Sequence, residues 1–327
     1  MSRLAPAHKR HTRPTTSALA QLARAQRTRD AKSAPLQLAT PPTTPEPPPD
    51  GSVRLSMPRE LPRPMLRPVS SDALAAIDPE LASIPVEFIR RSVLGMSKRI
   101  CDAMATVVPK TLPTSPLPRT VECVARDPSV ELGDMPTHFL IVYDPRAGKQ
   151  RGLLFPAHSL VLATQCSSLV RFSPTTRQLA DDNTLTVPLI GLGIPAPNAF
   201  SILNAFLYTH NPQQLIAALL PLPGAALASI SHESAGVASR LSRTMADWLS
   251  MRALLGALKV LHGVWANATS LGVNDDRLWT IIRFAWTVLI GAVERSAGVA
   301  PPNVYTDDEE ADLVDQALGD APPPYEA

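Results

Sequence analysis

The sequence predicts an α+β protein: a small sheet with its own helices, a helical extension after it, and a disordered arm at each end. Three observations support this prediction. Strand-type runs occur in the middle of the chain, and helix-type periodicity dominates after them. Proline supplies 35 of the 327 residues and aromatic residues only 5%, which indicates that part of the chain buries too little apolar surface to fold. The length of the chain is compatible with one large domain or with two small ones.

Residues 1–70 are expected to be a disordered, basic and proline-rich arm, because residues 1–32 hold eight Lys/Arg against Asp30 alone. Residues 299–327 are expected to be a disordered acidic tail, with eight Asp/Glu and no Lys/Arg from residue 301 onward. Such charge runs are typical of interaction tails. The basic arm is a candidate nuclear-import or phosphate-contacting patch. Because no aromatic residues accompany its charges, direct DNA binding is not expected.

Residues 71–136 are expected to be a helical and proline-rich lead-in. Ser71 or Asp72 is suited to cap a first short helix, and Pro85 is suited to the first turn of a second. A proline-rich stretch from 109 to 122 then ends the second helix. The apolar face predicted for the second helix consists of Phe88, Ile89, Val93, Met96, Ile100 and Met104.

Residues 137–225 are expected to form the folded core. The runs at 137–144 and 153–157 are predicted to pair as a hairpin across a charged turn, and 183–191 supplies a third strand. Three helices are predicted here, the first after His158, the second opened by Pro197 or Asn198, and the third capped by Asn211.

Residues 226–298 are expected to form a helical extension, whose last helix is capped by Asn274 or Asp275. The apolar run at 278–293 carries Arg283. A membrane-spanning helix needs about 20 residues with few charges, so we predict a buried helix and no membrane contact. The candidate partner surface, wherever it stays exposed, consists of Trp248, Trp265, Trp279 and Trp286.

The elements predicted for the core follow the order found in BTB/POZ domains. This order is the hairpin, the Phe-x-x-His motif at its end, the third strand and a helix that ends in NAFLYT. The resemblance runs from Thr137 to about Pro221. It implies a BTB/POZ-like small sheet with helices, which is a protein-interaction fold, and it leaves a homodimer open. The residues that match the BTB/POZ signature are Phe155, His158, Leu162, Phe200, Leu207 and Tyr208.

Longer stretches at 142–169 and 188–221, together with the tryptophan-rich helices, are similar to the clampless-type regulators of basidiomycete fungi. This similarity covers about residues 75–295. It implies a regulator of clamp-cell formation and dikaryon maintenance that acts in the nucleus, or also in the cytoplasm. The partners that it implies are transcription factors downstream of the mating-type homeodomain proteins.

The candidate catalytic groups do not form a recognisable site. His158 is expected to hydrogen-bond backbone at a helix start, since no second metal ligand or catalytic partner lies at a useful spacing. Ser231 and His232 suggest a hydrolase, but no Gly-x-Ser-x-Gly is present, and a helix start is the favoured interpretation. Full biological activity of the double alanine variant would exclude the hydrolase. We therefore expect no enzyme activity, metal, cofactor or small-molecule substrate.

The acidic tail ends in a Pro-Pro-x-Tyr motif made of Pro322, Pro323 and Tyr325. WW domains bind such motifs because the polyproline helix is preformed and stacks on aromatic side chains. WW-domain proteins are therefore candidate partners. The motif and the BTB/POZ resemblance also leave a second function open, an adaptor or client of a ubiquitin ligase.

Overall fold

The computed structural model describes residues 56–114, 116–147, 152–172, 174–175, 177, 179–180, 183–222 and 236–299. This part of the chain combines helices with a five-stranded sheet, which confirms the α+β class. The strand order is β1-β2-β5-β3-β4. The strands are β1 (Val107–Pro109), β2 (Thr120–Ala125), β3 (His138–Tyr143), β4 (Leu153–Ala157) and β5 (Thr184–Gly193).

The three predicted strands are β3, β4 and β5. β3 and β4 form the expected antiparallel hairpin, with Leu140 opposite Phe155. β5 lies parallel to β3 on its other side, with Ile190 opposite Leu140. A parallel pair needs a crossover connection, and the crossover here contains the short helix α5 (Ser159–Ala163).

The sequence analysis did not predict β1 and β2, which lie in the lead-in. β2 pairs with β5, so that Cys123 lies opposite Leu185. The sheet therefore includes strands from both the lead-in, residues 71–136, and the predicted core, residues 137–225. The alternation in β2 turns Val121 and Ala125 inward and leaves Glu122 exposed. The core on this side of the molecule consists of Val107, Val121, Cys123, Ala125, Met135, Phe139, Leu185 and Val187.

The lead-in also contains helices. α2 (Ser71–Ala75) is capped by Ser70, one residue before the predicted cap. The single long helix predicted after Pro85 is two helices, α3 (Val86–Gly95) and α4 (Ser97–Thr106), with the break after Gly95, a weak helix former. Ile89, Val93 and Ile100 are buried as predicted. Phe88 and Met96 are 61% and 36% exposed, so these two residues are not part of the buried face.

Two predicted helices follow β5. α6 (Phe200–Thr209) begins after a single 3-10 turn, Pro197–Ala199. α7 (Pro212–Leu219) begins at the predicted cap, where the Asn211 side chain accepts a hydrogen bond of 3.0 Å from the Gln214 amide.

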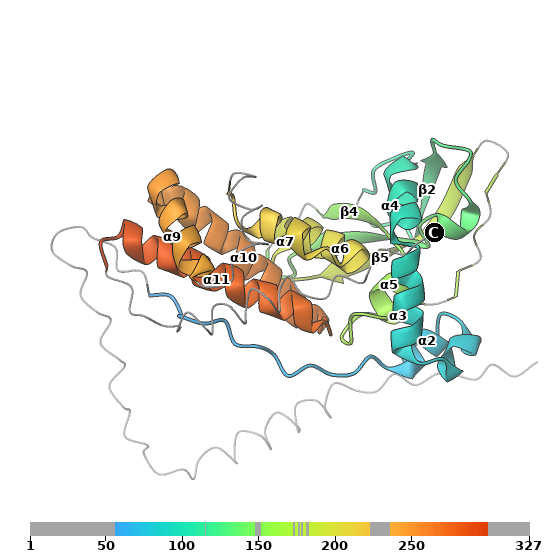
Figure 1. Cartoon of the computed structure of the whole chain (residues 1–327). Helices are drawn as coiled ribbons and strands as arrows, with labels where there is room; N and C mark the ends of the chain where they lie inside the picture. The colour runs from blue at the N-terminus through green and yellow to red at the C-terminus, as the bar shows by residue number, and fades with distance from the viewer. Residues whose placement is uncertain are drawn as a thin grey trace, which may run out of the picture. The chain divides into compact units, whose positions relative to one another are not determined.

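The helical extension contains α9 (Val237–Trp248), α10 (Met251–Leu271) and α11 (Asp276–Ser296), which pack together (Figure 1). Gly272, whose φ is 62°, ends α10 in the left-handed conformation that glycine adopts without strain. Asp275 caps α11, as predicted. None of the described helices is both long and apolar enough to cross a membrane.

The crossing of α9 and α11 depends on a glycine. A Cβ atom at Gly291 would lie 2.8 Å from Ser242 Oγ, whereas one at Gly256 on α10 would meet no atom within 4 Å. We expect Gly291→Ala to lower the free energy of unfolding by about 1–2 kcal/mol, because overpacking outweighs the gain in helix propensity. Gly256→Ala should raise the free energy of unfolding by about 0.5–1 kcal/mol. Urea denaturation measures both, and a stabilised Gly291→Ala variant would contradict the close crossing.

Candidate interaction surface

The four tryptophans of the predicted partner surface do not share one exposed face. Trp248, at the end of α9, is 70% exposed, and Trp265 on α10 is half-buried. Trp279 and Trp286 on α11 are only 5% and 3% exposed. These two rings are part of the interior, because α9 and α10 cover the apolar sides of α11. The part of the prediction that places Trp279 and Trp286 on an open surface is therefore corrected.

A proline-rich segment, residues 58–64, lies along α10 and α11, and we call it the strap (Figure 1). The Trp286 indole donates a hydrogen bond of 3.1 Å to the Pro58 carbonyl, and the Trp265 indole donates one of 3.1 Å to the Pro62 carbonyl. Two ion pairs flank these bonds. Arg59 lies 3.7 Å from the Glu294 carboxylate, and Arg63 contacts the carboxylate of Asp276.

The strap belongs to the arm that the sequence predicts to be disordered. Apolar periodicity does not reveal the strap, because backbone carbonyls and arginine side chains make the hydrogen bonds and ion pairs described above. No residue from 56 to 70 is buried, and Leu61 and Pro64 are half-buried. The strap is therefore held at the surface by hydrogen bonds and ion pairs, and exposed ion pairs of this kind contribute about 0–1 kcal/mol each.

The BTB/POZ-like signature residues come together between β4, α5 and α6. Phe155 and Phe200 pack edge to face with their ring centroids 5.1 Å apart. Leu162, Leu207 and Tyr208 are also buried. Two pairs of these residues meet in space, Phe155 with Phe200 and His158 with Tyr208.

His158 is buried and makes hydrogen bonds at both ring nitrogens. Nε2 lies 3.0 Å from the Asp134 carbonyl oxygen, which can only accept, so Nε2 carries the proton. Nδ1 lies 3.2 Å from the Tyr208 hydroxyl, which donates to it. The same hydroxyl accepts a hydrogen bond of 2.8 Å from the His158 amide. These bonds fix a neutral imidazole in a structural position.

Acid should destabilise the fold through His158. Burial lowers the pKa of His158 to about 4, whereas an unfolded chain has a histidine pKa of about 6.5. The neutral ring therefore stabilises the fold fully above pH 6.5, and this contribution is lost as the pH falls toward 4. We expect a loss of about 3 kcal/mol in the free energy of unfolding between pH 7 and pH 4.

Urea titrations across this range measure the effect. His158→Gln should flatten the pH dependence, because it removes the buried ring that must take up a proton. An equally steep dependence in His158→Gln would contradict the assignment. Burial also lowers the pKa of His138 to about 4, so the slope that remains in His158→Gln should have the same sign.

A polar cluster connects the end of α6 to the start of α11. His210 Nδ1 lies 3.0 Å from the Asp275 carboxylate, and Nε2 lies 2.8 Å from Gln165 Oε1. Gln165 donates through its Nε2 to the Leu207 carbonyl, which fixes the orientation of its amide. Both ring nitrogens of His210 thus face hydrogen-bond partners. This cluster joins the turn after α5 to the helical extension.

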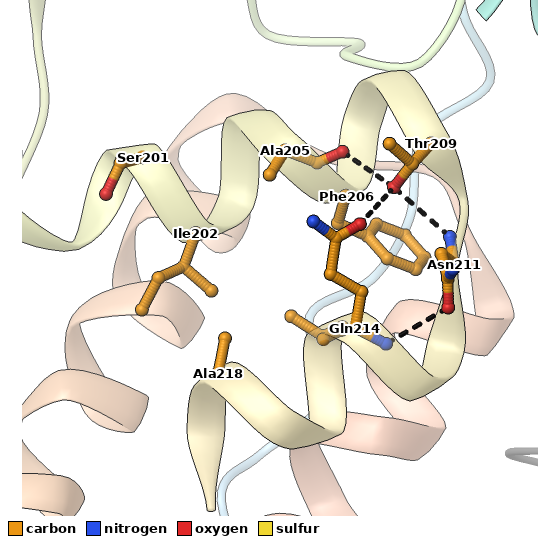
Figure 2. A pocket seen from close by; sticks show the side chains of 9 residues that line it. Ser201, Ile202, Ala205, Phe206, Thr209, Asn211, Gln214 and Ala218 are labelled. Atoms are coloured by element: carbon orange, nitrogen blue, oxygen red, sulfur yellow. Dashed lines mark hydrogen bonds between the residues drawn. The ribbon is translucent and has the colours of Figure 1, made fainter. Parts of the chain in front are cut away.

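A hollow of about 200 Å³ lies between α6 and α7 (Figure 2). None of its lining residues is titratable, and its polar groups largely bind one another, as in the bond from the Gln214 amide to Asn211. It therefore offers apolar contact and no acid or base. Its lining consists of Ser201, Ile202, Ala205, Phe206, Thr209, Asn211, Gln214, Leu215 and Ala218.

The described residues contain no group of three His, Cys, Asp or Glu side chains arranged to hold a metal ion. Burial raises the pKa of the Cys123 and Cys166 thiols to about 12, which keeps them protonated near neutral pH. The Pro-Pro-x-Tyr residues Pro322, Pro323 and Tyr325 lie outside the described residues, as do Ser231 and His232.

Comparison with known proteins gives two family matches. The model of the Clampless protein 1 N-terminal domain matches residues 64–195, which span the chain from the strap's last residue to just past β5. The model of the Clampless protein 1 C-terminal domain matches residues 213–322, beginning within α7. The sheet and the lead-in therefore fall within one family domain, and the helical extension falls within the other.

Two curated relatives are named Clampless protein 1 and come from two strains of Cryptococcus neoformans var. neoformans serotype D. Each is 31% identical to the chain over 113 residues, which are 35% of this chain and 22% of the relative. The match thus spans about a fifth of the length of these relatives. No solved structure matches the chain, so the BTB/POZ resemblance stays a prediction. Because the two domain models together cover most of its residues, the chain belongs to the Clampless protein 1 family.

Proposed function

We propose that this protein regulates fungal sexual development, namely clamp-cell formation and maintenance of the dikaryon. It acts by binding other proteins, and the partners that we propose are transcription factors downstream of the mating-type homeodomain proteins. The nucleus is the proposed site of action. Membership of the Clampless protein 1 family supports the developmental part of this proposal.

One observation carries the proposal that the protein works by binding. Trp248 ends α9 and is 70% exposed. Tryptophan is enriched among the residues that dominate binding energy at protein interfaces. The interior histidines His138 and His158 are held neutral by burial, and His158 is fully hydrogen-bonded to structural partners. This arrangement favours partner recognition over catalysis.

Replacing Trp248 with alanine should abolish partner capture and clamp-cell formation while leaving the fold intact. Because the ring is exposed, the free energy of unfolding should change by less than about 0.5 kcal/mol. The measurements are a pull-down from mating-competent cells and a count of clamp cells in a strain that lacks the wild-type protein. Phe88→Ala, which removes another exposed aromatic ring from α3, is the matched control and should retain both activities. Normal clamp formation with Trp248→Ala would refute the proposed surface.

The motif at Pro322, Pro323 and Tyr325 favours a second candidate function, an adaptor or client of a ubiquitin ligase. Tyr325→Ala in the full chain separates the two. If wild-type protein captures a cullin or a WW-domain ligase and the variant does not, the second function replaces the first. If both capture homeodomain or zinc-finger factors equally, the regulator is supported.

A further inference from the structure

The strap has the chemistry of a polyproline-type ligand bound to tryptophans. Pro58, Pro62 and Pro64 favour extended backbone, and the carbonyls of an extended segment without internal hydrogen bonds are free to accept. The indoles of Trp286 and Trp265 use two of these carbonyls. Domains that recognise proline-rich peptides read them with aromatic residues in the same way.

The charges on the strap are matched by charges on the helices. Arg59 pairs with Glu294 near the end of α11, and Arg63 pairs with Asp276 in its first turn. The strap therefore runs antiparallel to α11. The two accepting carbonyls are four residues apart, and so are the two arginines. Two indole bonds and two ion pairs thus define both the direction and the register of the bound segment.

The strap covers this surface without supporting the interior beneath it. The side chains of Arg59 and Arg63 remain 57% and 54% exposed, and no residue of the strap is buried. Helices α9, α10 and α11, in contrast, contact one another directly. A segment held in this way can be exchanged while the helices keep their packing.

We propose that α10 and α11 form a peptide-docking site and that the strap is its intramolecular occupant. The site takes, in exchange, a proline-rich segment of a partner protein that carries two arginines four residues apart. This inference rests on the proposed function in that the protein works by binding partners. Its test needs no developmental readout, and Trp248 is not among the strap contacts.

A tethered ligand competes at an effective concentration in the millimolar range. A free peptide should therefore bind the wild-type chain weakly and should bind more tightly once the strap is weakened. Arg59→Glu with Arg63→Glu places carboxylates opposite Glu294 and Asp276, while both positions are exposed enough to tolerate the change. We expect this double variant to bind a strap peptide at least about tenfold more tightly than the wild-type chain does.

The probe is a fluorescent peptide with the sequence of residues 56–68, titrated into full-length protein and followed by anisotropy. Adding Trp265→Phe to the double variant keeps a ring but removes the indole donor, and it should weaken binding by about two- to tenfold. A peptide with glutamate in place of both arginines should not bind. Thermal unfolding of each variant checks that the helices remain folded.

The proposal is overturned if the double variant binds the peptide no more tightly than the wild-type chain, or if Trp265→Phe leaves binding unchanged. It is also overturned, in favour of a second copy as the occupant, if the wild-type chain forms a dimer that the double variant loses. Failure of the peptide to bind would not affect the Trp248→Ala result, so the two proposals fail separately.

Discussion

Replacing Phe200 with alanine is expected to lower the free energy of unfolding by about 3–5 kcal/mol, because the change leaves a cavity at a fully buried position. Phe200 is the first residue of α6, and its ring packs edge to face on Phe155 of β4. The substitution therefore loosens the contact between the hairpin and the helix that follows the sheet. Urea denaturation followed by circular dichroism measures the loss.

The exposed Phe88 provides the control for this prediction, since Phe88→Ala should change the free energy of unfolding by less than about 0.5 kcal/mol. A double-mutant cycle with Phe155→Leu isolates the ring contact, for which we expect a coupling of about 0.5–1.5 kcal/mol. Equal costs for Phe200→Ala and Phe88→Ala would show that Phe200 is not a core residue.

Replacing Asn267 with leucine should lower the free energy of unfolding by about 1–3 kcal/mol. Asn267 is fully buried on α10, and its side chain hydrogen-bonds both backbone groups of Ala196: Oδ1 accepts from the amide at 2.9 Å and Nδ2 donates to the carbonyl at 2.7 Å. Leucine leaves the Ala196 amide unpaired, whereas the Ala196 carbonyl keeps the hydrogen bond of 3.0 Å from the Ala199 amide. Asn267 thus ties the helical extension to the turn after the sheet.

Asn204→Leu is the matched control for this second prediction. Asn204 lies on α6, and its Oδ1 has no hydrogen-bond partner among the described residues. Leucine there should change the free energy of unfolding by less than about 1 kcal/mol. If both substitutions cost the same, the two bonds to Ala196 do not hold the helices to the sheet.

Local signals predicted much of the fold. The hairpin of β3 and β4, the caps Asn211 and Asp275 and the buried character of α11 all follow from residues close together in sequence. β1 and β2 were missed because proline-rich flanks obscure a short alternation and because the pairing of β2 with β5 is non-local.

The candidate surface was harder to predict than the fold. α11 is apolar on most of its sides, so the burial of Trp279 and Trp286 depends on where α9 and α10 pack. The strap was missed because its backbone carbonyls accept hydrogen bonds from the helices. Every residue has a backbone carbonyl, so the pattern of side chains in the sequence does not indicate which carbonyls are bound. Trp248 is exposed, and its role in a partner surface stays a prediction.

The central place of β5 has a consequence for synthesis of the protein. β5 joins β2 to β3, and it is the last of the described strands to leave the ribosome. Until then the nascent chain carries two separate strand pairs, each with an unpaired edge. A chain that has emerged only to a point between 157 and 184 would keep both edges open to pairing with other chains.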